Sequence, residues 1–124
     1  MSKNRILIVE DNLILSLSLR DFLSLRGYKN IELAKTYEEA ISLLEENNFD
    51  ITYLDVMLIG KKTGIDVAEY IREKDLDTRI FYLSAMNSFP EVKTQMLETN
   101  PEHIFSKPVN YQDIFNKLRQ LEVN

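Results

Sequence analysis

The sequence predicts an α/β fold: an open, doubly wound sheet of five parallel strands with five helices packed on its two faces. Short apolar runs alternate with longer stretches of helical periodicity, which is typical of parallel strands joined by right-handed crossovers. Three of the runs are apolar at consecutive positions, the pattern of strands covered on both faces. With 124 residues, the chain can form one core but not two, so we expect a single domain over residues 1–124 with no output domain.

The apolar runs and the stretches between them define the expected elements. The strands are predicted, in chain order, at Arg5–Val9, Asn30–Ala34, Asp50–Leu54, Arg79–Ser84 and His103–Ser106. The helices are predicted at Asn12–Arg26, Tyr37–Asn47, Gly64–Lys74, Phe89–Thr99 and Tyr111–Glu122. Gly27 and Asn100 follow or close two of these helices, where a left-handed residue is usually needed. Two pairs have the capping-box spacing of a helix start: Thr36 with Glu39, and Ser88 with Glu91.

Composition excludes several classes of function. The chain has no cysteine, which excludes disulfides, thiol catalysis and thiolate metal sites. Its net charge of −5, with no cluster of Lys and Arg, argues against a nucleic-acid-binding surface, which needs concentrated positive charge. The apolar run near the N-terminus is far shorter than the roughly 20 residues of a membrane span. We therefore expect no nucleic-acid or membrane partner and a cytoplasmic location.

Acidic residues follow two of the predicted strands. Glu10 and Asp11 follow the first strand, and Asp55 follows the third. In parallel α/β sheets the carboxyl ends of the strands form the ligand-binding edge, so these three carboxylates are expected to meet there. Like charges at close range repel unless a cation lies between them. The cluster therefore predicts a hard divalent cation such as Mg²⁺, although Glu10 and Asp11 taken alone also fit a solvated loop.

Two other strand ends carry groups that suit a phosphoryl group. Ser84 closes the fourth predicted strand, and Lys107 follows the fifth. A hydroxyl and an ammonium group on one edge would bind phosphoryl oxygens. An ionised carboxylate needs no general base to act as a nucleophile, and aspartyl phosphates are established covalent intermediates. With Mg²⁺ and Lys107 neutralising charge, the site is suited to transferring a phosphoryl group to Asp55.

Five segments of the chain resemble a known family over essentially its whole length. They are, in order, residues 6–12 (ILIVEDN), 53–58 (YLDVML), 64–68 (GIDVA), 83–85 (LSA) and 107–108 (KP). Each segment is a weak signal alone. Together, in this order and at the expected places, they resemble the bacterial two-component response-regulator receiver domain. The resemblance implies a flavodoxin-like fold with strand order 2-1-3-4-5.

The resemblance also implies a role for each matching residue. Asp55 is the implied phosphoacceptor, Ser84 the switch hydroxyl and Lys107 the lysine that contacts the phosphoryl group. The implied Mg²⁺ ligands are the carboxylates of Glu10, Asp11 and Asp55 and the backbone carbonyl of Met57. The family usually has a cis peptide bond after this lysine, here before Pro108.

A phosphoacceptor, rather than a turnover enzyme, is the function that the resemblance implies. Asp55 is expected to receive its phosphoryl group from a histidine kinase or a histidine phosphotransfer protein, and a small-molecule phosphodonor would be a substitute. Phosphorylation would shift an equilibrium between inactive and active forms. The signal would then pass by contact with a downstream protein that the sequence does not identify.

Departures from the family pattern keep alternatives open. Ile104 stands where an aromatic residue is usual, and the loop over residues 58–64 is one residue longer and lacks the usual proline. These departures leave open a degenerate receiver that binds partners without phosphorylation. A phosphatase acting through an aspartyl phosphate is disfavoured because Met57 stands where such enzymes place a second acid. A flavin-binding module is disfavoured because acids follow Val9, where a phosphate-binding loop is needed. Met57 and Met86 flank the site, where they would either slow the approach of water or serve in packing.

The first predicted helix is apolar on two faces. One stripe, suited to the sheet, consists of Leu15, Leu19, Phe22 and Leu23. A second stripe, which the same sheet would not cover, consists of Leu13, Ile14, Leu17 and Leu25. A helix with two apolar faces is either fully buried or has a partner. We expect Ile14 and Leu17 to form a surface for the phosphodonor or for a homodimer, and scattered surface leucines explain the second stripe equally well.

Overall fold

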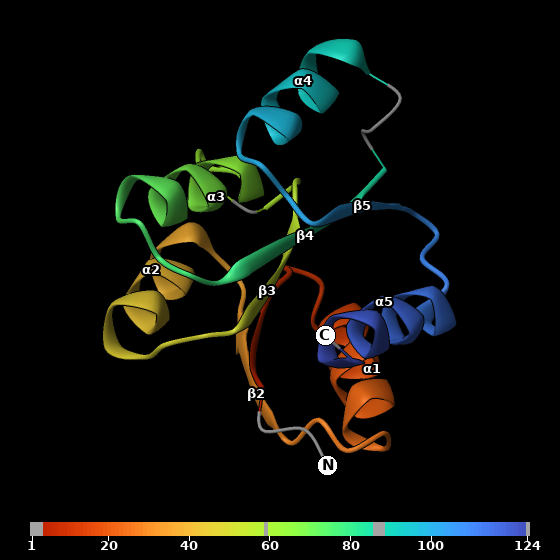
Figure 1. Ribbon diagram of the computed structural model, residues 1–124. Coiled ribbons are helices and arrows are strands. Elements are labelled where there is room, and N and C mark those ends of the chain that lie inside the picture. The colour runs from red at the N-terminus through yellow and green to blue at the C-terminus, as the bar shows by residue number, and fades with distance from the viewer. Residues whose placement is uncertain (1–3, 59, 86–88, 124) are drawn as a thin grey trace.

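The computed structural model describes residues 4–58, 60–85 and 89–123, and its centre is a sheet of five parallel strands (Figure 1). The strands are β1 (Arg5–Val9), β2 (Asn30–Ala34), β3 (Ile51–Asp55), β4 (Arg79–Ser84) and β5 (His103–Ser106). Their order in the sheet is β2-β1-β3-β4-β5. The predicted fold class and strand order are therefore confirmed.

Helices alternate with the strands along the whole described chain. They are α1 (Leu13–Ser24), α2 (Tyr37–Glu46), α3 (Gly64–Glu73), α4 (Pro90–Glu98) and α5 (Tyr111–Val123). Predicted and observed helix ends differ by at most two residues. Among the strands only β3 differs from the prediction, because it begins and ends one residue later, so Asp55 closes the strand instead of following it. Among the described residues, no helix is long and apolar enough to cross a membrane.

The sheet separates two apolar cores. Figure 1 shows α1 and α5 together on one face, while α2 and α3 lie on the other. Along β1 the side chains alternate: Leu7 and Val9 pack in the core on the α2–α3 side, which also contains Met96 of α4. Ile6 and Ile8 pack in the core on the α1–α5 side. This alternation explains the consecutive apolar residues of the central strands, since both faces of the sheet are covered.

Helix ends follow the predicted signals with one exception. Gly27 and Asn100 have φ angles of +99° and +56°, the left-handed conformation expected at a helix end. The Thr36 hydroxyl accepts the backbone N–H of Glu39 at 3.1 Å, as predicted. The Glu39 carboxylate, however, accepts the backbone N–H of Lys35 at 2.8 Å, so the capping box does not close on Thr36 itself. The predicted cap Ser88 lies outside the described residues.

The start of α3 packs directly against the end of β3. A Cβ on Gly64 would lie 2.1 Å from the carbonyl oxygen of Asp55, a separation that no side chain tolerates. The Gly64 N–H donates to the carbonyl oxygen of Val56 at 3.0 Å. Thr63 and Asp66 form a complete capping box at the same point. Glycine at position 64 therefore permits the close approach of α3 to Asp55, beyond giving the loop freedom.

Helix α1 covers the sheet with a face slightly different from the predicted one. Leu19 and Leu23 are buried as predicted, but Leu15 is 41% exposed and Ser16 is buried in its place. The prediction for Leu15 is therefore wrong. Of the second stripe, Leu13, Ile14 and Leu25 are exposed, whereas Leu17 is half-buried. A docking or dimer surface that includes Ile14 stays a prediction.

Candidate functional site

Three carboxylates meet at the carboxyl edge of the sheet. One carboxylate oxygen from each of Glu10, Asp11 and Asp55 lies within 4.8 Å of the others. Glu10 and Asp55 are buried and Asp11 is half-buried. The Glu10 N–H donates to the carbonyl oxygen of Ala34 at 2.9 Å, which continues the pairing of β1 with β2 by one residue and fixes the position of Glu10. The predicted convergence of the acids is present.

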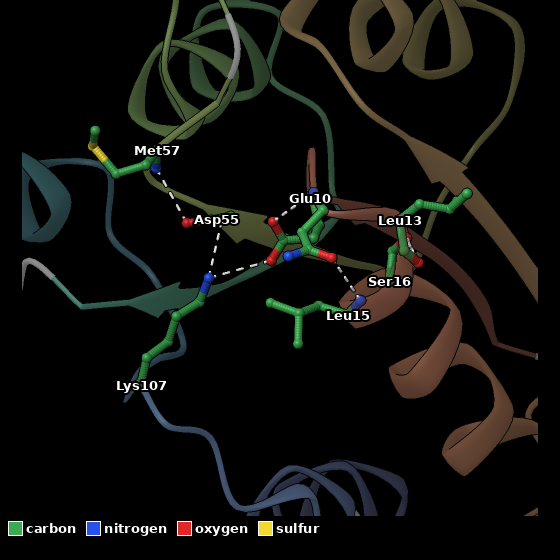
Figure 2. A network of polar contacts seen from close by, with 8 residues as sticks. Glu10, Leu13, Leu15, Ser16, Asp55, Met57 and Lys107 are labelled. Atoms are coloured by element: carbon green, nitrogen blue, oxygen red, sulfur yellow. Dashed lines mark hydrogen bonds and ion pairs between the residues drawn. The ribbon is translucent and has the colours of Figure 1, made fainter.

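Lys107 brings one positive charge to these acids. Its Nζ lies 3.0 Å from Oδ2 of Asp55 and 3.2 Å from Oε1 of Glu10 (Figure 2). The backbone N–H of Lys107 donates to the carbonyl oxygen of Ser84 at 3.0 Å. This hydrogen bond joins the ends of β5 and β4 just before the chain leaves the sheet. The peptide bond between Lys107 and Pro108 is cis, as the resemblance implied.

Backbone N–H groups hold the outer oxygens of two of the acids. Oδ1 of Asp55 accepts the N–H of Met57 at 3.1 Å, and Oε2 of Glu10 accepts the N–H of Asn12 at 3.1 Å. The Asn12 side chain also accepts the N–H of Leu15 at 3.2 Å and so caps α1. Each carboxylate therefore uses one oxygen for a backbone donor and the other for Lys107. The orienting role of Asn12 was not predicted, although Asn is a strong signal for the cap of a helix.

Ser84 lies at the end of the strand beside Asp55. In the β3–β4 register Asp55 is opposite Leu83, so Ser84 is one residue further toward the site edge. Its side chain is fully buried. The Met57 side chain, by contrast, is 58% exposed, and Figure 2 shows it turned away from the carboxylates. The other flanking methionine, Met86, lies outside the described residues.

Burial and crowding of like charges determine the electrostatics of the site. Burial, followed by the hydrogen bond and charge of Asp55, raises the pKa of Glu10 from its ordinary 4.5 to about 8. Burial alone would lower the pKa of Lys107, but the hydrogen bonds and charges of Asp55 and Glu10 outweigh it and raise that pKa. When all the groups are ionised, three carboxylates face one ammonium group, which leaves two uncompensated negative charges.

The donor set fits a magnesium ion. Every donor in the cluster is a carboxylate oxygen, the ligand type that Mg²⁺ prefers. A divalent cation would balance the two negative charges that Lys107 leaves uncompensated. Burial and the neighbouring Asp55 raise the pKa of Glu10, so a cation bound at this carboxylate would take the place of a proton. The backbone of Met57 is next to the cluster, since its N–H contacts Asp55.

Comparison with known proteins identifies the family. The family model described as the response regulator receiver domain matches residues 6–119. The chain belongs to this receiver family. It is 32% identical over 117 residues to the response regulator MprA of Mycobacterium sp. (strain KMS), and this match covers 94% of the chain and 50% of MprA. It is also 32% identical to the transcriptional regulatory protein YvrH of Bacillus subtilis (strain 168), over 96% of the chain and 49% of YvrH. The receiver chain thus spans about half the length of these curated relatives.

Solved structures of other receiver domains have the same architecture. The non-phosphorylated HemR receiver domain of Leptospira biflexa superposes with a TM-score of 0.84 at 32% identity, over 95% of this chain and 93% of that one. TrrA of Thermotoga maritima, solved in complex with Mg²⁺ and BeF, superposes with a TM-score of 0.80 at 28% identity, over 95% of this chain and 98% of that one. In this receiver, Ile104 is half-buried and packs against the core on the α2–α3 side.

Proposed function

We propose that this receiver accepts a phosphoryl group on Asp55, in a Mg²⁺-dependent reaction, from a histidine kinase or a histidine phosphotransfer protein. The proposal rests on one observation: a buried aspartate with two further carboxylate oxygens within 4.8 Å and a lysine ammonium 3.0 Å away. Membership of the receiver family supports it. In this proposal Asp55 is the reacting group, and Ser84 and Lys107 contact the phosphoryl group, as the resemblance to receiver domains implies.

The chemistry would proceed at the oxygens of Asp55. One carboxylate oxygen attacks phosphorus, the bond from phosphorus to the histidine nitrogen of the donor breaks, and the aspartyl phosphate remains. Lys107, whose Nζ lies 3.0 Å from Asp55, would contact the incoming phosphoryl oxygens, and the buried Ser84 hydroxyl would approach them from the adjacent strand end. Bound Mg²⁺, held by Glu10, Asp11, Asp55 and the carbonyl of Met57, would supply positive charge where the phosphoryl oxygens accumulate negative charge.

The output would be a change in protein–protein contacts. The phosphoryl group adds negative charge at an edge that already contains three acids, which biases the protein toward a second conformation. Because Ile104 has no aromatic ring to reorient, we propose that the change is not transmitted by the aromatic residue usual in the family. We also propose a cytoplasmic location and a role as phosphoacceptor instead of turnover enzyme.

Part of the proposed contact surface lies on α1. Leu13 and Ile14 are exposed in the first turn, immediately after the acids. Ile14→Lys would weaken phosphotransfer from a protein donor or self-association, whereas phosphorylation by acetyl phosphate would be unchanged. Leu25→Lys, at the exposed residue just after the opposite end of α1, is the matched control. If Ile14→Lys leaves both phosphotransfer and the sedimentation coefficient unchanged, this surface is excluded.

The decisive experiment is intact mass spectrometry after incubation with acetyl phosphate or phosphoramidate and Mg²⁺. We expect one added phosphoryl group on the wild type and none on Asp55→Asn, while Asp113→Asn, an exposed acid of α5, retains it. Hydrolysis of many equivalents of donor would indicate a phosphatase. A protein that is never modified, from a protein donor or a small molecule, would be a phosphorylation-independent interaction module.

A further inference from the structure

We propose that the apolar cavity beside Lys107, which we call the acyl cavity, binds the hydrocarbon tail of an acyl phosphate whose phosphoryl group is transferred to Asp55. This inference rests on the proposed phosphoacceptor function and adds a substrate preference to it. The receiver would use acyl phosphates with tails of three or more carbons better than acetyl phosphate.

The acyl cavity lies between α1 and the segment that joins β5 to α5. Its volume is about 310 Å³, at the lower end of the range for small-molecule sites, about 300–1,000 Å³. Most of its walls are apolar side chains: Ile8, Leu15, Leu19, Leu83, Val109 and Tyr111. Ile8, Leu19 and Leu83 are buried, so the floor is preformed by the core between the sheet and α1, whereas Leu15 and Val109 form the more open sides.

One wall of the acyl cavity is shared with the phosphoacceptor site. Glu10 and Lys107 line the cavity, and the same Lys107 Nζ contacts Asp55 at 3.0 Å. Figure 2 shows the Leu15 side chain extending from α1 into the space next to Glu10, on the side of Lys107. A ligand bound across this wall would have its anionic end at Lys107 and its apolar end among aliphatic side chains. This distribution of charge and apolar surface is that of an acyl phosphate.

The exposure of Leu15 has an explanation in this arrangement. Ser16 takes the place on the sheet face that Leu15 was expected to fill, and its hydroxyl donates to the carbonyl oxygen of Leu13 at 3.1 Å. A small buried residue here leaves space above Leu19, and Leu15 borders that space instead of filling it. A larger side chain at position 16 would occupy part of the acyl cavity.

The transfer is balanced without any further reactant. A carboxylate oxygen of Asp55 forms a bond to phosphorus, and the bond between phosphorus and the acyl oxygen breaks with its electron pair on that oxygen. The products are the aspartyl phosphate and the free carboxylate, so the total charge is unchanged and no proton moves. Acetate and butyrate are leaving groups of nearly equal basicity, so a difference in rate between their acyl phosphates reports binding of the tail.

The expected preference follows from the burial of methylene groups. Moving one methylene from water into an apolar site changes affinity by about fourfold. Butyryl phosphate has two more methylenes than acetyl phosphate, so full burial would raise the second-order rate constant of phosphorylation by about 15-fold. Partial burial of the two methylenes would raise this rate constant about threefold to tenfold.

The test compares acetyl phosphate and butyryl phosphate, each with Mg²⁺, by the initial rate at which Asp55 is phosphorylated. The measured quantity is the butyryl-to-acetyl rate ratio. Two variants fill the acyl cavity from opposite sides: Ser16→Leu from α1 and Val109→Trp from the β5–α5 segment. Either variant should bring the ratio to about one, and two variants protect the test against misfolding of one. Leu25→Ala, at the exposed residue that follows α1 and lies outside the cavity, should keep the wild-type ratio.

Each outcome is decisive. A wild-type ratio above about three that disappears in a folded cavity-filling variant supports the proposal. A wild-type ratio below about three overturns it and leaves the acyl cavity to another apolar group, such as a side chain of a protein partner. A high ratio that persists in both filled variants places the preference elsewhere and also overturns it. If acetyl phosphate itself fails and protein donors fail too, the proposed phosphoacceptor function is wrong; if acetyl phosphate succeeds, only the tail preference is in question.

Discussion

The Lys107 ammonium group contacts two carboxylates: its Nζ lies 3.0 Å from Oδ2 of Asp55 and 3.2 Å from Oε1 of Glu10. Removing this charge would leave Asp55 and the incoming phosphoryl group without their positive partner. We expect Lys107→Ala to reduce the rate of phosphorylation by acetyl phosphate about 100-fold, the usual order of magnitude for losing one preorganised donor.

Lys107→Arg is the matched control, because it keeps the charge but changes its shape. The rate of phosphorylation in Lys107→Arg should lie between those of Lys107→Ala and the wild type. Intact mass spectrometry over time measures the rate for each variant. Equal rates in wild type and Lys107→Ala would show that Lys107 has no part in the transfer.

Stability should depend on pH through Glu10. The pKa of Glu10 rises from 4.5 to about 8 on folding, so the folded protein favours the protonated form. The resulting stability is fully present below pH 4.5 and is lost as the pH rises toward 8. Between these values, metal-free protein should lose unfolding free energy with a slope of at most about 1.4 kcal/mol per pH unit.

Urea unfolding at several pH values, with and without Mg²⁺, measures this effect. Mg²⁺ should stabilise the protein more at pH 8 than at pH 6, because at pH 6 it must displace the proton from Glu10. Glu10→Gln should reduce both the pH slope and the stabilisation by Mg²⁺. An unchanged slope in Glu10→Gln would contradict the assignment.

Gly64 should be the position in the β3–α3 segment that is most sensitive to an added methyl group. In Gly64→Ala the Cβ would lie 2.1 Å from the carbonyl oxygen of Asp55 and 2.9 Å from its carbonyl carbon. Both neighbours are backbone atoms, so relief requires α3 or Asp55 to move. We expect a loss of about 3 kcal/mol of stability or more, together with slower phosphorylation.

Gly60→Ala serves as the comparison, because a Cβ there has no neighbour within 4 Å but the φ angle is +107°. It should cost only the backbone strain, about 1–2 kcal/mol. Thermal or urea unfolding gives both values. If Gly64→Ala proves no worse than Gly60→Ala, the contact with Asp55 does not limit the fold.

Tyr82 and Thr99 should hold the end of α4 on the sheet. The Tyr82 hydroxyl and the Thr99 hydroxyl are 2.6 Å apart and buried. Tyr82→Phe removes this hydrogen bond, while Thr99 keeps its bond to the carbonyl oxygen of Met96. We expect a loss of about 1–2 kcal/mol and faster amide hydrogen exchange in α4. Tyr70→Phe, at a half-buried tyrosine of α3, is the control. Unchanged exchange in α4 would show that other contacts hold the helix.

The sequence was sufficient to predict the strands and the meeting of the acids. Consecutive apolar residues, as in Ile6–Val9, leave few alternatives to a strand covered on both faces. In a parallel sheet the ends of such strands share one edge, and this brings Glu10, Asp11 and Asp55 together. Lys107 was placed at the same edge for the same reason. These predictions depend on the order of strands and helices, which the pattern of apolar residues predicts.

Details that depend on packing between distant segments were not predictable. Periodicity alone assigned Leu15 to the sheet, but the helix is rotated enough to bury Ser16 instead. The acyl cavity is lined by α1 and by residues about 90 positions later in the chain. A local sequence pattern cannot predict a space between segments so far apart. Likewise, the Glu39 carboxylate accepts the backbone N–H of Lys35 and not that of Thr36. A flexible side chain can reach either of two neighbouring N–H groups, so the spacing does not decide between them.

The contact between Gly64 and the Asp55 backbone has a consequence for the length of the loop that precedes it. The segment from Gly64 onward is anchored by Thr63 and Asp66 and packs directly against the backbone of Asp55, so it cannot move closer to β3. Any insertion between β3 and α3 must bulge outward before Thr63, near Gly60. A chain lengthened there would leave the acidic edge undisturbed, whereas one extra residue after Thr63 would push the helix against Asp55.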